Sequence, residues 1–207
     1  VGAIRAESLH QLIDLARVFT TQPLPKGHRL GILTTSGSLG ALATDIAVSS
    51  GLTVPPLPSL MVKQVQEISP DWMNVKNPLD IGPSRIFSRL LPMLLADPGI
   101  DMVLAIMAIP YVAVRYFKSA GMTVKDWFGD IAPIRERYPD KPLLSVVVGH
   151  PAYVDDITSL CGRSVPVFTS PELAAEALAT LWNYSKTRKK SGDRKEGRRV
   201  RSQHSTS

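Results

Sequence analysis

The sequence lacks several features that mark large classes of protein. Its 207 residues include a single cysteine, Cys161, which excludes an internal disulfide and fits a buried or loop thiol without chemistry. The longest apolar run, Met102–Ile109, is far shorter than the roughly 20 residues of a membrane-spanning helix. No signal-peptide pattern opens the chain. These absences predict a cytoplasmic protein that does not interact with a membrane.

The histidines do not suggest a metal site or a hydrolase. The four residues, His10, His28, His150 and His204, are scattered without metal-ligand spacing and without companion cysteines. Ser36 and His150 would be a nucleophile and a base only in a hydrolase, and the Gly-x-Ser-x-Gly sequence of many such enzymes is missing. We therefore predict no catalytic residue and no metal ligand in this chain.

Charge is spread unevenly along the chain. The formal net charge is +6, but residues 186–207 hold nine lysines and arginines against Asp193 and Glu196, a balance of +7. Residues 1–185 therefore carry a net charge of −1. No aromatic residue that could stack on bases is interleaved with the basic residues. We predict a disordered basic tail and no specific binding of nucleic acid.

Segments typical of strands alternate with segments typical of helices. Strands are predicted from continuous apolar runs at residues 29–34, 102–108, 143–148 and 165–168, and a fifth strand near Leu52 is left open. Helices are predicted at residues 8–19, 39–50, 59–68, 85–96, 124–137, 152–160 and 171–184. Trp72, Trp127 and Trp182 lie on or beside amphipathic segments, which predicts packing roles for them.

This alternation predicts the fold class. Short connections between strands and helices require parallel pairing with right-handed crossovers. We therefore predict an α/β fold, a three-layer flavodoxin-like doubly wound parallel sheet with helices on both faces. Ligands of such sheets collect beyond the carboxyl ends of the strands. The loops at residues 35–40, 108–111 and 149–153 are accordingly expected to share one edge.

The sharpest local motif, Thr34–Gly40, joins an apolar strand to an alanine-rich helix. Glycine lets the backbone approach an anion, and the N–H groups and dipole of the following helix favour negative charge. The predicted phosphate-binding residues are Ser36, Gly37, Ser38 and Gly40. The motif is neither Gly-x-Gly-x-x-Gly nor a Walker sequence, whose lysine is absent. Close packing of the helix on the strand is therefore the alternative explanation of the glycines.

A second candidate segment is Asn77-Pro-Leu-Asp80, a loop stiffened by its proline. In one interpretation Asn77 and Asp80 position a neighbouring loop or reach a ligand. In the other, they form an Asx-turn that caps the next helix. The residues alone leave both interpretations open.

Several segments, taken in order, resemble one enzyme family. They are Gly2–Leu9 with the helix after it, Gln22–Gly27, the strand with its glycine-rich turn, Asn77–Asp80, Asp97–Asp101 before a buried strand, and Thr169–Leu178. Their order across residues 1–185 is similar to the last third of the acyl-binding subunit of NDP-forming (ADP-forming) acyl-CoA synthetases, relatives of succinyl-CoA synthetase. The chain looks like the second flavodoxin-like CoA-ligase domain of that family.

The resemblance implies a role in a larger enzyme. The family interconverts acid, CoA and nucleoside triphosphate with acyl-CoA, nucleoside diphosphate and phosphate, through an acyl phosphate and a phosphohistidine. CoA, ATP or ADP, and Mg²⁺ are implied for the full enzyme, and none of them for this chain alone. The implied partners are a CoA-binding domain, a histidine-carrying ligase domain and an ATP-grasp module, as domains or subunits. Ser36–Gly40 matches the family's phosphate-binding turn, and Asn77 with Asp80 matches its Asn-Pro-x-Asp loop.

These expectations divide the chain into three parts. Residues 1–27 are a lead-in helix and linker packed on the domain, residues 28–185 are the flavodoxin-like CoA-ligase domain, and residues 186–207 are the disordered tail. Such a part of a longer protein is expected to be inactive alone. The alternative function is a noncatalytic docking or regulatory module. Flavin or nucleotide binding is a third function, and it rests on the fold class alone.

Overall fold

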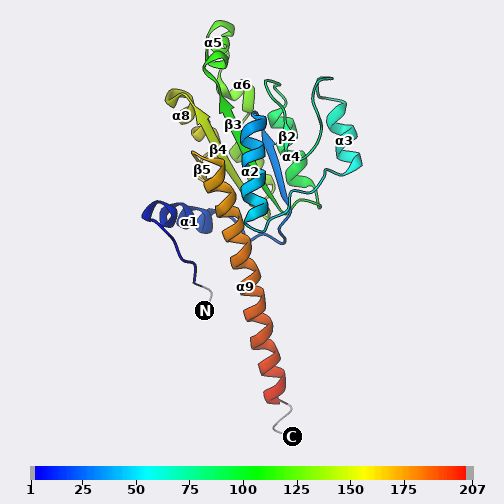
Figure 1. Ribbon diagram of the computed structural model, residues 1–207, viewed down its shortest axis with the longest axis vertical. Coiled ribbons are helices and arrows are strands. Elements are labelled where there is room, and N and C mark those ends of the chain that lie inside the picture. Colours follow the sequence, from blue (N-terminus) through cyan, green and yellow to red (C-terminus); the bar gives the residue numbers. More distant parts are fainter. Residues whose placement is uncertain (1–2, 204–207) are drawn as a thin grey trace.

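Five parallel strands form a single sheet at the centre of the molecule (Figure 1). The computed structural model describes the backbone of residues 3–203, and their side chains except at positions 114, 117, 118, 152 and 189–203. The strands are β1 Leu30–Thr34, β2 Leu79–Asp80, β3 Met102–Ile109, β4 Leu143–Gly149 and β5 Val167–Phe168. Their order, β2-β1-β3-β4-β5, is the flavodoxin-like order. The predicted fold class is confirmed.

Helices cover both faces of this sheet. Their bounds are α1 Leu9–Thr21, α2 Gly37–Ser49, α3 Ser59–Gln66, α4 Phe87–Ala96, α5 Tyr111–Ala120, α6 Val124–Phe128, α7 Ile131–Arg137, α8 Pro151–Cys161 and α9 Pro171–Gln203. Buried side chains of α1, α2 and α9 pack on one face, against Ile32 and Leu104 among others. Buried side chains of α3, α4, α6, α7 and α8 pack on the other face, against Leu33 and Ala105. Neighbouring strand residues therefore point into two separate cores, as the period of two requires.

Strand β3 shows why the sequence folds in this way. Its run of apolar residues is buried except at Ala108, because helices cover it from both sides and β1 and β4 flank it. A strand that is buried on both faces has no need of polar alternation. The predicted strand at residues 102–108 is therefore confirmed, with one residue added at its end.

Two predicted features differ in the structure. The fifth strand is β2, within the segment that we expected to be a loop, whereas Thr53 near Leu52 makes only an isolated bridge to Arg29. The predicted helix at 124–137 is two helices, α6 and α7, because the chain turns at Gly129 with a φ of 70°. Two residues of β2 are too few to give a recognisable apolar period.

The basic tail also differs from its prediction. Helix α9 continues through residue 186 to Gln203, where we expected disorder (Figure 1). Lysine, arginine and glutamate are good helix formers, and no proline interrupts the segment. The packed first half of α9 already supplies the nucleus, so the helix extends without a new nucleation cost. Within residues 3–203, no helix combines the length and apolar character needed to cross a membrane.

The lead-in segment is capped at the start of its helix and bonded to the domain at its end. Ser8 is the N-cap of α1, and its hydroxyl accepts a hydrogen bond from the N–H of Gln11 at 3.1 Å. At the other end, the side chain of Gln22 donates to the carbonyl of Ser164 at 2.7 Å and accepts from the N–H of Leu143 at 2.9 Å. Gln22 is buried, so these bonds fix the linker against the start of β4.

Candidate functional site

Three strands end side by side at one edge of the sheet. Thr34 at the end of β1 pairs with Ile106, and Ile109 at the end of β3 pairs with Gly149 at the end of β4. The loops that we expected to share an edge therefore do so. From β1 the chain crosses to β2 on one side and then returns to β3 on the other. This reversal between β1 and β3 is the place where ligands of such sheets bind.

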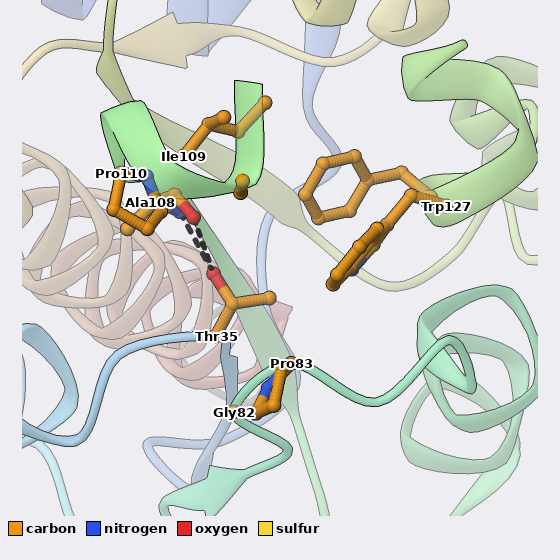
Figure 2. Close-up of a pocket in the computed structure, with 9 residues that line it drawn as sticks. Thr35, Gly82, Pro83, Ala108, Ile109, Pro110 and Trp127 are labelled. Carbon is orange, nitrogen blue, oxygen red and sulfur yellow. Dashed lines mark hydrogen bonds between the residues drawn. The ribbon is translucent and has the colours of Figure 1, made fainter. Parts of the chain in front are cut away.

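Thr35 joins the ends of β1 and β3. Its backbone N–H donates to the carbonyl of Ile106 at 3.1 Å. Its hydroxyl accepts from the N–H of Ala108 at 2.8 Å and donates to the carbonyl of the same residue at 3.1 Å (Figure 2). The next residue, Ser36, is thereby held at a fixed position on the sheet edge.

Helix α2 begins directly after this joint. Ser36 is its N-cap in extended conformation, and the Ser36 side chain does not cap the helix but lies 3.2 Å from the hydroxyl of Ser38. The first helical bond runs from Gly40 N–H to the Ser36 carbonyl at 3.0 Å. In the part of the chain that the structure describes, the N–H groups of Gly37, Ser38 and Leu39 have no acceptor. Such groups, with the positive end of the helix dipole, attract an anion.

The two glycines of the predicted turn have different surroundings in the structure. Helix α2 starts at Gly37, two residues earlier than predicted, so both glycines lie in its first turns. Gly40 is buried, and a Cβ atom there would lie 2.9 Å from Cγ2 of Thr34 and 3.4 Å from Cβ of Pro78. Gly37 is exposed. Gly40 therefore serves close packing, whereas Gly37 remains open to a ligand.

Replacing Gly40 with alanine is expected to lower the free energy of unfolding by about 1 kcal/mol, because the overlap with Thr34 outweighs the gain in helix propensity. Urea denaturation measures this change. Ala41→Gly, at an exposed position of the same helix, gives the propensity contribution by itself. A Gly40→Ala protein that is more stable than the native one would contradict the packing role.

Asp80 borders the same helix end. Its Oδ1 accepts a hydrogen bond from the N–H of Gly82 at 3.0 Å, which is an Asx-turn. Its Oδ2 lies so close to Gly37 that a Cβ there would be 2.7 Å away. The next helix, α4, begins only at Phe87, so the turn does not cap it. The carboxylate instead interacts favourably with the positive end of the α2 dipole, and it repels a second negative charge that approaches this helix end.

Asn77 holds the framework of the site together. Its Oδ1 accepts from the N–H of Ile32 at 2.9 Å, and its Nδ2 donates to the carbonyls of Leu30 at 2.8 Å and Pro55 at 2.9 Å. The amide therefore pairs with β1 as a neighbouring strand would. The Asn77–Pro78 peptide bond is cis, and it leads the chain into β2. Its position fits the predicted loop-positioning role, and ligand contact stays a prediction.

An apolar cavity of about 200 Å³ opens beside Thr35 (Figure 2). It is lined by residues from the ends of β1 and β3, the loop after β2, and helices α5 and α6: Thr35, Gly82, Pro83, Ala108, Ile109, Pro110, Ala113, Trp127 and Phe128. Sequence reasoning missed this cavity, because α5 was not predicted and Trp127 was assigned to packing. The spacing of Val112, Ala113 and Tyr116 was the available signal for α5.

The remaining candidate groups are structural. Cys161 is buried, and burial raises the pKa of its thiol to about 11, so the thiol stays protonated at neutral pH. Its sulfur lies 3.6 Å from the hydroxyl of Ser145. Among the side chains that the structure describes, no three of histidine, cysteine, aspartate or glutamate are grouped where they could hold a metal ion.

Comparison with known proteins places this site in context. No family model matches the chain. The chain is 30% identical over 191 residues to the ADP-forming acetate–CoA ligase II subunit alpha of Pyrococcus furiosus, an alignment that covers 89% of this chain and 40% of that subunit. It is 28% identical over 187 residues to the ADP-forming 4-hydroxybutyrate–CoA ligase of Nitrosopumilus maritimus, covering 89% of this chain and 25% of that enzyme.

A solved structure from Pyrococcus horikoshii OT3 has the same fold. It matches with a TM-score of 0.77 and 28% identity, over 89% of this chain and 42% of that one. The chain therefore spans less than half the length of the relatives that it matches.

Proposed function

This chain belongs to the superfamily of ADP-forming acyl-CoA ligases, and from that premise we propose that it serves as a ligase domain whose helix α2 binds the phosphoryl group. In this proposal it contributes binding and positioning, and partner domains or subunits supply CoA, the nucleotide and the histidine that carries phosphate. The reaction of the whole enzyme joins an acid to CoA with breakdown of a nucleoside triphosphate to the diphosphate and phosphate.

The observation that carries the proposal is the open first turn of α2. Three consecutive N–H groups, which meet no acceptor among the described residues, lie at the reversal point of the sheet, next to the hydroxyls of Ser36 and Ser38. Transfer of a phosphoryl group needs fixed donors that neutralise its charge without forming a bond of their own. The bonds of Thr35 and Thr34 hold the start of this turn before any ligand arrives.

The cofactors of the relatives fit this division of labour. Their names specify ligation to CoA with formation of ADP. Mg²⁺ in such enzymes is usually held by one or two carboxylates together with phosphate groups of the substrate. In our proposal the partner units bind Mg²⁺, nucleotide and CoA. The α2 turn of this chain then faces a phosphoryl group that those units deliver.

Asp80 gives the proposed site a built-in limit on affinity. Its carboxylate lies against Gly37, so a phosphate at the N–H groups of α2 meets a like charge within a few ångströms. A group that must be handed on during turnover gains nothing from tight binding of the free anion. We expect weak, readily reversible binding of inorganic phosphate.

Titration with inorganic phosphate tests the site. We expect saturable shifts of the Gly37, Ser38 and Leu39 amide signals in NMR spectra at millimolar phosphate. Asp80→Asn is expected to tighten binding by roughly threefold to tenfold, because it removes the opposing charge. Asp45→Asn, an exposed position further along α2, is the matched control and is expected to leave the affinity unchanged. Amide shifts absent from residues 37–39 would refute the phosphate role.

One observation favours the second candidate, a docking or regulatory module. Helix α5 projects from the carboxyl end of the sheet (Figure 1) and exposes Tyr111, Val112 and Tyr116 at 68%, 76% and 53%. A surface of this kind suits contact with another unit. The module would bind such a unit without any response of the α2 amides to phosphate, and the titration above therefore separates the two functions.

A further inference from the structure

We propose that helix α1 joins two copies of this chain by pairing with α1 of the second copy in antiparallel orientation. The paired surface consists of Leu9, Leu12, Ile13 and Ala16, which we call the α1 stripe. This inference goes beyond the proposed function, because it concerns an interaction surface away from the α2 turn. The linker after α1 is bonded to the start of β4, whereas the α2 turn lies at the carboxyl ends of the strands.

The α1 stripe is an apolar surface that faces solvent. Its residues follow the spacing i, i+3, i+4 and i+7, which places them on one side of a helix. Leu9, Leu12 and Ile13 are exposed at 74%, 54% and 52%, and Ala16 is exposed as well. One exposed leucine is ordinary, but a continuous row of large apolar side chains marks a contact surface.

The domain uses the other side of α1. Leu15 and Val18 are buried in the core that α1 shares with α2 and α9. Phe19 packs edge-to-face on Tyr184 of α9, with ring centroids 5.2 Å apart. A helix that is apolar on two sides requires a neighbour on each. Helix α1 stands out from the side of the domain (Figure 1), so a second chain has access to the α1 stripe.

The α1 stripe is complementary to itself in one orientation. A two-fold axis between Leu12 and Ile13 places Leu12 of one copy against Ile13 of the other. The same axis places Leu9 of each copy against the small Ala16 of the other, so that large and small side chains alternate along the contact. Because this contact is isologous, it covers both stripes at once and closes at two copies.

The charges at the two ends of the α1 stripe favour the same orientation. Glu7 precedes the stripe and Arg17 follows it. Within one copy, Glu7 lies 3.2 Å from Arg5, and Arg17 lies 3.8 Å from Asp14. Such pairs at the surface contribute little, so they are exchanged at little cost. Antiparallel pairing brings Glu7 of each copy toward Arg17 of the other, whereas parallel pairing brings like charges together.

The size of the contact sets the expected affinity. Helix α1 has 13 residues, and a single pair of such helices lies at the low end of the about 1,200–2,000 Å² that stable interfaces bury. We therefore expect a reversible dimer with a dissociation constant on the order of 10–100 μM.

The test is analytical ultracentrifugation of the full chain between about 5 and 500 μM, a range that brackets the expected constant. Leu12→Asp places a charge in the middle of the contact and should weaken dimerisation at least tenfold. Leu60→Asp, at a leucine of α3 that is 69% exposed, is the matched control and should leave the dissociation constant unchanged. A native chain that stays monomeric throughout, or a Leu12→Asp protein with native affinity, would overturn the proposal.

A pair of cysteines tests the orientation. In a chain with both Leu9→Cys and Ala16→Cys, antiparallel pairing brings the new thiols of opposite copies together, and mild oxidation should yield a covalent dimer. Within one helix these positions are about 10 Å apart, which is too far for a disulfide. Cys161 is buried, with a pKa of about 11, and should not react. Equal cross-linking by Leu9→Cys alone would contradict the antiparallel arrangement.

Reversal of the end charges gives a readout that leaves the apolar contact intact. Glu7→Arg and Arg17→Glu should each weaken the dimer by about twofold to fivefold, and the double variant should recover native affinity. Additive losses in the double variant would show that Glu7 and Arg17 do not meet across the contact, and would overturn the proposed register.

Discussion

Replacing Asn77 with alanine is expected to lower the free energy of unfolding by about 3 kcal/mol. The side-chain amide makes three hydrogen bonds, to the backbone of Ile32, Leu30 and Pro55. Ile32 and Leu30 are fully buried, so their N–H and carbonyl groups would lose a partner without gaining water. Each buried polar group left unpaired costs about 1–3 kcal/mol. Urea denaturation at neutral pH measures the loss.

Two companion variants make the Asn77 prediction specific. Asn77→Asp should be more damaging than alanine, because a carboxylate would face the carbonyls of Leu30 and Pro55. Asn74→Ala, at an exposed position of the same segment, should change stability by less than about 0.5 kcal/mol. Equal stability of the Asn77→Ala and Asn74→Ala proteins would show that the amide does not hold β1.

The long elements of the fold could be predicted because their local patterns agree with their tertiary surroundings. The uninterrupted apolar run at 102–109 fits a strand covered on both faces, and Ser8 caps α1 as its position suggests. Strand β2 could not be predicted in this way. Its two residues pair with β1 because Asn77 fixes the chain beside that strand, and side-chain pairing of this kind leaves no period in the sequence.

The candidate site was predicted in outline only. The order of strand, glycines and helix was sufficient to locate the first turn of α2 at the sheet edge. Gly37 and Gly40 have different roles because Gly37 lies next to Asp80 and Gly40 lies next to Thr34. The spacing of the glycines in the sequence does not reveal these neighbours. The apolar cavity beside Thr35 depends on how closely the loop at Pro83 approaches Trp127, and these two residues are far apart in the chain.

Replacing Asp101 with asparagine is expected to lower the free energy of unfolding by about 2 kcal/mol at pH 7, because bonds to a charged partner are lost. The Asp101 carboxylate binds Arg29 through Nε at 2.8 Å, Nη2 at 2.9 Å and the backbone N–H at 3.0 Å. Its side chain is 7% exposed, against 43% for that of Arg29. The pair thus fastens the entry of β1 to that of β3, and urea denaturation measures its contribution.

The same pair predicts a pH dependence with a definite sign. Burial would raise the pKa of Asp101, but the hydrogen bonds and charge of Arg29 outweigh it and hold that pKa below its ordinary value. A carboxyl with a lowered folded-state pKa stabilises the protein fully above its unfolded pKa of about 3.9 and loses that stabilisation as the pH falls through the folded value. The free energy of unfolding of the native protein should therefore fall more between about pH 5 and about pH 3 than that of the Asp101→Asn protein.

The control for this pH dependence is Asp140→Asn, because the contact of Asp140 with Lys26 joins two exposed side chains and contributes little. Parallel pH profiles for the native and Asp101→Asn proteins would mean that the carboxylate does not stabilise the junction, and that packing of Gly27 against Asp101 holds it instead.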